Sequence, residues 1–177
     1  QKKVLIAIAR AGNVIGGGDW SKDRIIPDCI KSWSRNKKVL IRNPKSTRPW
    51  QHVLDVIYGY MLLAVNLKKN PKLNGEAFNF GPDKNLKVID VISKIKNYWP
   101  EVKWKIKKNL NFKEHNLLHL NNKKSKRYLK WSSNLNFNNS IKFTVQWYKD
   151  CLKNKRKSYL YSSSQILKYQ EFLKNKF

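Results

Sequence analysis

The stretch Val4-Leu5-Ile6-Ala7-Ile8-Ala9-Arg10-Ala11-Gly12-Asn13-Val14-Ile15-Gly16-Gly17-Gly18-Asp19-Trp20 decides the fold. Its first six residues are apolar without alternation, which favours a strand covered on both faces, as in a parallel α/β sheet. The glycines that follow predict a loop beyond the carboxyl end of that strand, where open α/β sheets bind their ligands. We therefore expect a ligand at this junction. The alternative is a short antiparallel edge strand in a self-contained domain.

A strand of this kind needs neighbours that the remaining sequence does not obviously supply. Nothing downstream resembles a set of partner strands that are each followed by a helix. The apolar run begins at about residue 3, and the chain begins with Gln1 rather than Met. We therefore expect the chain to be the C-terminal part of a longer protein. Taken alone, its first strand would lack neighbours and expose apolar surface.

The composition is that of a globular protein. With 177 residues, of which 41% are hydrophobic and 12% aromatic, the chain can form a core and is not a disordered tail. No apolar run approaches the roughly 20 residues that span a bilayer, and no signal peptide is recognisable, so we expect no membrane partner. Cys29 and Cys151 fall in predicted helices, which favours reduced thiols and a cytoplasmic protein. The histidines have no metal-ligand spacing, and we expect no metal site.

The net charge of +27 raises the possibility of nucleic-acid binding. The cations are 31 Lys and only 7 Arg, accompanied by 20 Asn, a pattern that resembles a coding bias toward A-rich codons. Specific recognition of phosphates and bases favours Arg, and no nucleic-acid-binding motif is present. We expect no specific nucleic-acid partner, and a basic nucleic-acid-binding module is the less favoured alternative.

The remaining sequence predicts a mixed α/β order. The second predicted helix begins with Asp55 as N-cap and buries the stripe Ile57, Tyr60, Met61, Ala64 and Leu67 as ordinary core. A capping box at residues 162–165 predicts the start of the last helix, which ends near residue 174. The other predicted helices lie near residues 27–35, 87–99, 122–129 and 139–153, and the other strands near 38–42, 77–80 and 104–107.

Five segments carry a family resemblance through their order and spacing. They are residues 10–20, 23–28, 41–44, 48–54 and 78–82. Together they resemble nucleotide-sugar enzymes of the extended short-chain dehydrogenase/reductase family, and the Gly-Gly-Gly-Asp-Trp and Arg-Pro-Trp-Gln-His elements favour its CDP-glucose 4,6-dehydratase branch. The tail, to about Leu152, agrees more loosely. The sequence departs from the family at Asn121, where Asp is usual, and at Lys130, where Gly is usual. Lys130 would cost about 1 kcal/mol if its backbone is left-handed.

The resemblance implies the C-terminal portion of an extended Rossmann-type fold. The chain would contain the last strands of the large domain and the smaller mixed α/β substrate-binding lobe. Residues 1–20 would end the NAD-binding Rossmann domain and form the sugar-nucleotide loop. Residues 21–153 would form the substrate-binding lobe with interleaved Rossmann elements, and residues 154–177 a C-terminal helical tail. We expect the full-length protein to be a homodimer.

The resemblance also implies specific site residues. Asn13, Arg24 and Arg48 would bind the diphosphate and sugar of the substrate, a role that suits Arg because its planar guanidinium is always charged and donates several hydrogen bonds. Gln51, His52 and Glu114 would lie near the substrate cleft, without an assigned role. The nicotinamide ring of NAD would be bordered, mostly by backbone, at Arg10, Ala11, Gly12 and Val14.

Two motifs that the family uses for hydride transfer and for binding the dinucleotide are missing from the sequence. No Tyr is followed four residues later by Lys, and the glycine triplet does not have the spacing of a dinucleotide fingerprint. We therefore assign no catalytic residue and expect the chain to be inactive alone.

The function that the resemblance implies is the nucleotide-sugar-binding part of an enzyme that converts CDP-glucose to CDP-4-dehydro-6-deoxy-glucose for surface polysaccharides. The alternative enzyme is another family member, an epimerase or a dehydratase acting on a UDP-, GDP- or dTDP-sugar.

Overall fold

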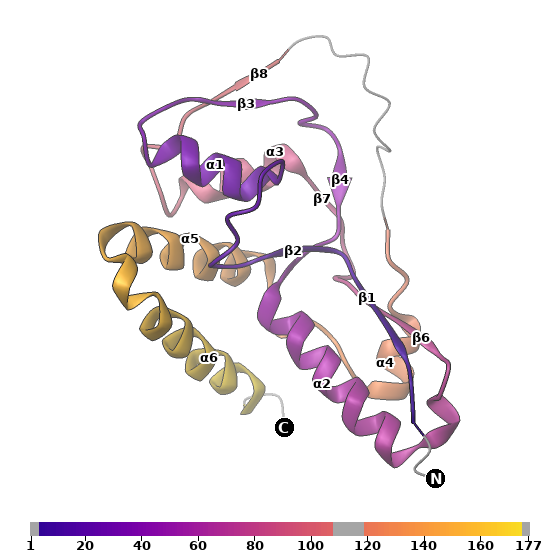
Figure 1. Cartoon of the computed structure of the whole chain (residues 1–177). Coiled ribbons are helices and arrows are strands. Elements are labelled where there is room, and N and C mark those ends of the chain that lie inside the picture. Colours follow the sequence, from indigo (N-terminus) through magenta and orange to yellow (C-terminus); the bar gives the residue numbers. More distant parts are fainter. Residues whose placement is uncertain (1–3, 108–118, 175–177) are drawn as a thin grey trace.

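The computed structural model describes residues 4–107 and 119–174 (Figure 1). The helices are α1 (Ile25–Trp33), α2 (Val53–Lys69), α3 (Val88–Lys96), α4 (Lys123–Leu129), α5 (Phe137–Lys153) and α6 (Ser158–Lys174). The strands are β1 (Ile8–Ala11), β2 (Asn13–Ile15), β3 (Val39–Ile41), β4 (Thr47–Arg48), β5 (Trp50–His52), β6 (Ala77–Phe80), β7 (Leu86–Lys87) and β8 (Trp104–Ile106). Mixed α/β architecture is confirmed, and the long predicted helices and strands are found within a few residues of their expected limits.

Two hydrophobic cores organise the chain. The larger core gathers residues of α1, α3, α5, β3 and β5, and the smaller one lies among α2, α4 and β6. In Figure 1 these cores correspond to the upper and the lower right parts of the molecule, with β2 running between them. The strands form pairs: β1–β6, β2–β5 and β3–β8 are parallel, and β4–β7 is antiparallel.

The first strand differs from its prediction. β1 begins at Ile8 rather than near residue 3 and pairs with β6 alone among the described residues. Ala7 and Ala9 pack against the smaller core, whereas Ile6 and Ile8 are exposed, because α2 and α4 cover only one face of the pair. The expectation of a strand covered on both faces was therefore wrong within this chain. The expectation that it would expose apolar surface is confirmed, although it does have one neighbour.

The prediction of which face of α2 is buried was also wrong. Ile57, Tyr60 and Met61 of the predicted core stripe are exposed, and the helix buries Val56, Gly59 and Leu63 instead. α2 is apolar around most of its circumference, so periodicity could not identify the side that faces the core.

Asp55 is not the N-cap of α2. His52 holds that position, and its Nδ1 accepts a hydrogen bond from the Leu54 N–H at 3.3 Å. The Asp55 carboxylate is buried in the first turn, where it accepts hydrogen bonds from the Asn134 N–H (2.8 Å) and the Tyr169 hydroxyl (2.8 Å). Burial raises the pKa of Asp55, and this outweighs the hydrogen bonds, which lower it. Asp55 thus attaches α2 to the chain before α5 and to α6.

Smaller differences concern the C-terminal part. α6 begins at Ser158, a turn before the predicted capping box. Lys130 ends α4 in the left-handed conformation, with φ +53°, as the family's glycine position suggested. Glu114 and His115 lie outside the described residues. In the described ranges no helix is long and apolar enough to cross a membrane, and no cluster of three or more His, Cys, Asp or Glu could hold a metal ion.

We expect Lys130→Gly to stabilise the protein by about 1 kcal/mol, because glycine adopts a left-handed backbone without the steric cost of a Cβ atom. Denaturant unfolding monitored by circular dichroism measures the change. Lys96→Gly, in the last turn of α3, is the matched control and should destabilise the protein by about 1 kcal/mol. A loss of stability in both variants would contradict the prediction.

Candidate functional site

A cavity of about 880 Å³ opens where β2, β3 and the start of α1 meet. Its volume lies within the range of small-molecule binding sites. Segments distant in the sequence line it, from Ala11 at the end of β1 to Tyr148 on α5. The expected position of a ligand, at the junction of the first strand and the glycine loop, therefore coincides with a real hollow.

The structure brings the three predicted substrate residues together around this cavity. Asn13 begins β2, Arg24 is the residue before α1, and Arg48 ends β4. The Arg48 Nη1 donates to the Thr47 carbonyl at 2.9 Å, which restrains the guanidinium at the cavity wall. An amide and two guanidiniums supply hydrogen-bond donors that suit a diphosphate.

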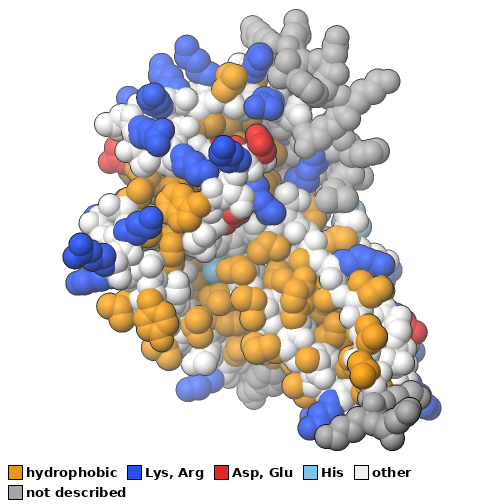
Figure 2. All heavy atoms as spheres, in the orientation of Figure 1, with side chains coloured by type: hydrophobic (Ala, Val, Ile, Leu, Met, Phe, Trp, Pro, Cys, Tyr) orange, Lys and Arg blue, Asp and Glu red, His pale blue; other side chains and the backbone are white. Residues whose placement is uncertain are grey.

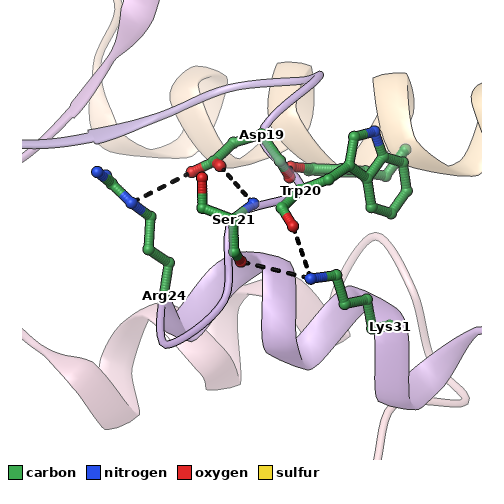
Figure 3. A network of polar contacts seen from close by, with 6 residues as sticks. Asp19, Trp20, Ser21, Arg24 and Lys31 are labelled. Carbon is green, nitrogen blue, oxygen red and sulfur yellow. Dashed lines mark hydrogen bonds and ion pairs between the residues drawn. The ribbon is translucent and has the colours of Figure 1, made fainter.

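Asp19 is the counter-ion of Arg24 in this site (Figure 3). The Arg24 Nε lies 3.9 Å from Asp19 Oδ2, and the Asp19 Oδ1 accepts a hydrogen bond from the Ser21 N–H at 2.9 Å. Partial burial pushes the pKa of Asp19 upward, but the Ser21 hydrogen bonds and the nearby Arg24 and Lys31 outweigh it, so the net pKa is lowered. The Lys31 Nζ donates to the carbonyls of Trp20 and Ser21 and so ties the loop to α1.

The glycine loop has a different role from the one expected. A Cβ atom on Gly17 would lie 2.1 Å from the Trp147 ring, and one on Gly16 would lie 2.6 Å from Val53 Cγ1. These glycines permit close packing against the protein, and Gly16 also lines the cavity. Gly18 instead permits the turn itself, with φ +87°. The Tyr148 hydroxyl then donates to the Asp19 carbonyl at 2.6 Å and holds the end of the loop.

The predicted cofactor residues divide into two groups. Ala11, Gly12 and Val14 line the cavity, whereas Arg10 is not among the lining residues. Gly12 packs tightly on Pro49, since a Cβ atom there would lie 2.6 Å from the Pro49 carbonyl oxygen. The segment therefore presents small residues and backbone groups to the cavity.

The sequence reasoning missed several lining residues. Arg42, Asn43 and Ser46 follow β3 and line the same cavity, as do Asp19 and Asp23. Arg42 brings a third guanidinium to a site for which two were expected. The signal was present, because residues 41–44 were among the segments that carried the family resemblance, but no role was assigned to Arg42 or Asn43.

Gln51 and His52 lie behind the cavity wall. The Gln51 Nε2 donates to the Phe80 carbonyl at 2.6 Å, and that carbonyl also accepts from the Gly12 N–H. His52 is buried between Gly16 and Phe143, and burial lowers its pKa to about 4. Both residues support the strands that carry Asn13 rather than line the cavity.

A comparison with curated proteins finds a relative that matches most of this chain. The CDP-glucose 4,6-dehydratase of Salmonella typhimurium strain LT2 is 38% identical over 152 residues, which are 84% of this chain and 42% of that protein. This chain is a homologue of that enzyme. It spans less than half the length of its relative. No family model matches the chain.

Solved structures show that this homologue has the fold of the extended short-chain dehydrogenase/reductase enzymes. The UDP-glucose-4-epimerase of Stenotrophomonas maltophila superposes with a TM-score of 0.75 at 15% identity, over 86% of this chain and 50% of the epimerase. The UDP-glucuronic acid 4-epimerase of Bacillus cereus, solved with UDP-glucuronic acid and NAD, gives 0.71 at 21% identity, over 83% and 46%. The dTDP-glucose 4,6-dehydratase of Bacillus anthracis, solved with NAD, gives 0.64 at 19% identity, over 85% and 45%.

We expect Gly17→Ala to destabilise the protein by about 2 kcal/mol, because the methyl group overlaps the Trp147 ring and the loop must shift. Thermal unfolding of the variant measures the loss. Gly18→Asn is the comparison variant: the nearest atom to its Cβ is 3.8 Å away, so its cost comes from the left-handed backbone alone and should be smaller, about 1 kcal/mol. Equal stability of Gly17→Ala and the unmodified chain would show that the glycine is not required for this contact.

Proposed function

We propose that this chain supplies the nucleotide-sugar-binding part of a CDP-glucose 4,6-dehydratase. The observation that carries the proposal is the convergence of Arg24, Arg42 and Arg48 with Asn13 on one cavity of about 880 Å³. Its size suits a nucleotide sugar, and its guanidiniums suit the diphosphate. The 38% identity to the Salmonella enzyme favours CDP-glucose over other nucleotide sugars.

In the proposed reaction, the sugar is first oxidised at C4, with transfer of a hydride to NAD. Oxidation acidifies the proton at C5, so water is eliminated across C5 and C6 to leave a C5–C6 double bond. The same hydride then returns to C6 as a proton is added at C5. The products are CDP-4-dehydro-6-deoxy-glucose and water, and the cofactor ends in its starting form. This chain binds and orients the substrate for these steps, and the residues that transfer the protons lie in the part of the enzyme that it does not span.

The residues present fit one end of NAD. Ala11, Gly12 and Val14 offer small, neutral surface and backbone groups at the cavity, against which a nicotinamide ring can lie. The sequence has no dinucleotide fingerprint for the cofactor's pyrophosphate. The chain therefore contributes to the nicotinamide end of the cofactor site, and the remaining contacts come from the rest of the enzyme. NAD supplies the hydride acceptor and donor when bound.

We expect Arg48→Ala to weaken the binding of CDP-glucose by about tenfold to a hundredfold, because charge-assisted hydrogen bonds to the diphosphate are lost. Isothermal titration calorimetry on the purified chain measures the dissociation constant. Arg24→Ala should have a smaller effect, because Arg24 is more than half exposed and already paired with Asp19. Arg35→Ala, an exposed position outside the cavity, is the matched control and should bind like the unmodified chain.

The same titration with UDP-, GDP- and dTDP-glucose tests the proposed base. CDP-glucose should bind most tightly. Equal affinity for all four nucleotide sugars would overturn the assignment to CDP-glucose. Unchanged affinity in Arg48→Ala would overturn the assignment of this cavity to the substrate.

A further inference from the structure

Polar side chains hold the last helix, α6, against the rest of the chain. Ser162, Gln165 and Tyr169 follow one another at intervals of three and four residues, so they lie on one side of α6. Among the residues described for this helix only Tyr169 is buried, while Leu160 and Leu167 are 57% and 62% exposed. Figure 2 shows hydrophobic side chains open at the surface where α6 runs in Figure 1. Hydrogen bonds therefore have a large part in fixing the position of α6.

Contrary to the prediction of a capping box, Ser162 and Gln165 lie inside α6 and bond α5. The Trp147 Nε1–H donates to the Ser162 hydroxyl at 2.9 Å, and the Gln165 Nε2 donates to the Phe143 carbonyl at 2.7 Å. The Ser162 hydroxyl donates its own proton to the Ser158 carbonyl at 3.1 Å, so the lone pairs of its oxygen are left for the indole. The direction of the Trp147 ring is thereby fixed from α6.

Trp147 carries this contact to the glycine loop on the other side of α5. In Figure 1, α5 lies between β2 and α6, and it contacts both. The Trp147 ring is 6% exposed and packs on Gly17, where a Cβ atom would lie 2.1 Å from it. Tyr148, the next residue, packs edge-on against Trp147 and donates to the Asp19 carbonyl at 2.6 Å. The two aromatic side chains therefore set the course of the loop from Gly17 to Asp19.

This loop forms part of the cavity wall. Gly16 and Asp19, at its two ends, line the cavity, and the Asp19 carboxylate lies 3.9 Å from the Arg24 Nε. Binding groups must be held within about 0.5 Å of their productive positions by the residues that support them. A movement of the Trp147 ring would shift the loop, and with it the ion pair between Asp19 and Arg24.

We propose that Ser162 is a positioning residue for substrate binding, which acts through Trp147 on the loop from Gly16 to Asp19. Without the Ser162 hydroxyl the buried indole N–H would lose its acceptor, and a buried donor without a partner is costly, so the ring would turn to find another. It would then leave Gly17, and the cavity wall would lose its support. α6 is thus part of the binding site, although the described lining of the cavity includes none of its residues. This inference rests on the proposed function.

The first test compares affinities for CDP-glucose by isothermal titration calorimetry on the purified chain. Ser162→Ala should weaken binding about threefold to tenfold, because the hydrogen bond that fixes Trp147 is lost. Ser162→Thr should bind within about twofold of the unmodified chain, because threonine keeps the hydroxyl and its bond to the carbonyl four residues before. Ser164→Ala, at an exposed serine two residues further along α6, is the matched control and should bind like the unmodified chain.

Lys96→Gly separates positioning from a general loss of stability. It destabilises the last turn of α3, outside the cavity, and should leave the affinity for CDP-glucose unchanged. All titrations are made well below the unfolding transition of each variant, which thermal unfolding by circular dichroism locates. Equal affinity of Ser162→Ala and the unmodified chain, or equal weakening by Lys96→Gly, would overturn the inference.

Nuclear magnetic resonance gives a readout that needs no nucleotide sugar. The Trp147 ring lies directly on Gly17, so its ring current displaces the Gly17 Hα signals from ordinary glycine values. Ser162→Ala should move these signals toward ordinary values, and Ser162→Thr should restore them. The signals of Gly75, where a Cβ atom would have no neighbour within 4 Å, should not change.

The two readouts distinguish failure of this inference from failure of the proposed function. Gly17 signals that are the same in Ser162→Ala and in the unmodified chain would overturn the inference. Signals that respond as expected, in a chain whose unmodified form binds no nucleotide sugar, would overturn the proposed function and leave the control of the loop by Ser162 in place.

Discussion

The parallel pairing of β2 with β5 is the constraint on which the site depends. It aligns Asn13 with Trp50 and Ile15 with His52, and so places the glycine loop beside the start of α2. Trp50 and Ile15 belong to the larger core, while Gln51 bonds the Phe80 carbonyl of the smaller one. Asn13 belongs to this pairing and Arg48 lies two residues before Trp50, so loss of the register would separate these two cavity residues and also the two cores.

The sequence predicted the parts of the fold with strong local signals. The amphipathic helix α3 lies within the predicted residues 87–99, and Asn136 caps α5 within a few residues of its predicted start. The order of the segments around Arg24 and Arg48 was also sufficient to place the predicted substrate residues on one cavity. These features depend on local spacing or on the family resemblance, and both are visible in a single chain.

The predictions failed where contacts between residues far apart in the sequence determine the structure. α2 has apolar residues on both sides, so only the positions of Phe80 and Trp131, which touch Gly59, select the face that is buried here. Asp55 resembled an N-cap, but its partners are Asn134 and Tyr169, far along the chain. The glycine triplet predicted a hollow, which Gly16 does line, but not the close packing of Gly16 on Val53 and of Gly17 on Trp147. A residue's type and spacing do not reveal which remote side chain occupies the space beside it.

In the proposed site, the ion pair between Arg24 and Asp19 means that a bound anion would have to replace the Asp19 carboxylate at the Arg24 guanidinium. Arg24 is not a bare cation that any small anion would neutralise, because the Asp19 carboxylate already compensates its charge at 3.9 Å. An exposed pair at this distance contributes little stability, so an anion with better geometry can displace the carboxylate. A diphosphate, which accepts several hydrogen bonds at once from planar guanidiniums, meets that condition, whereas a monovalent ion does not. In the proposed function, selectivity at this position would thus come from competition with the Asp19 carboxylate as well as from the positive charge of the chain.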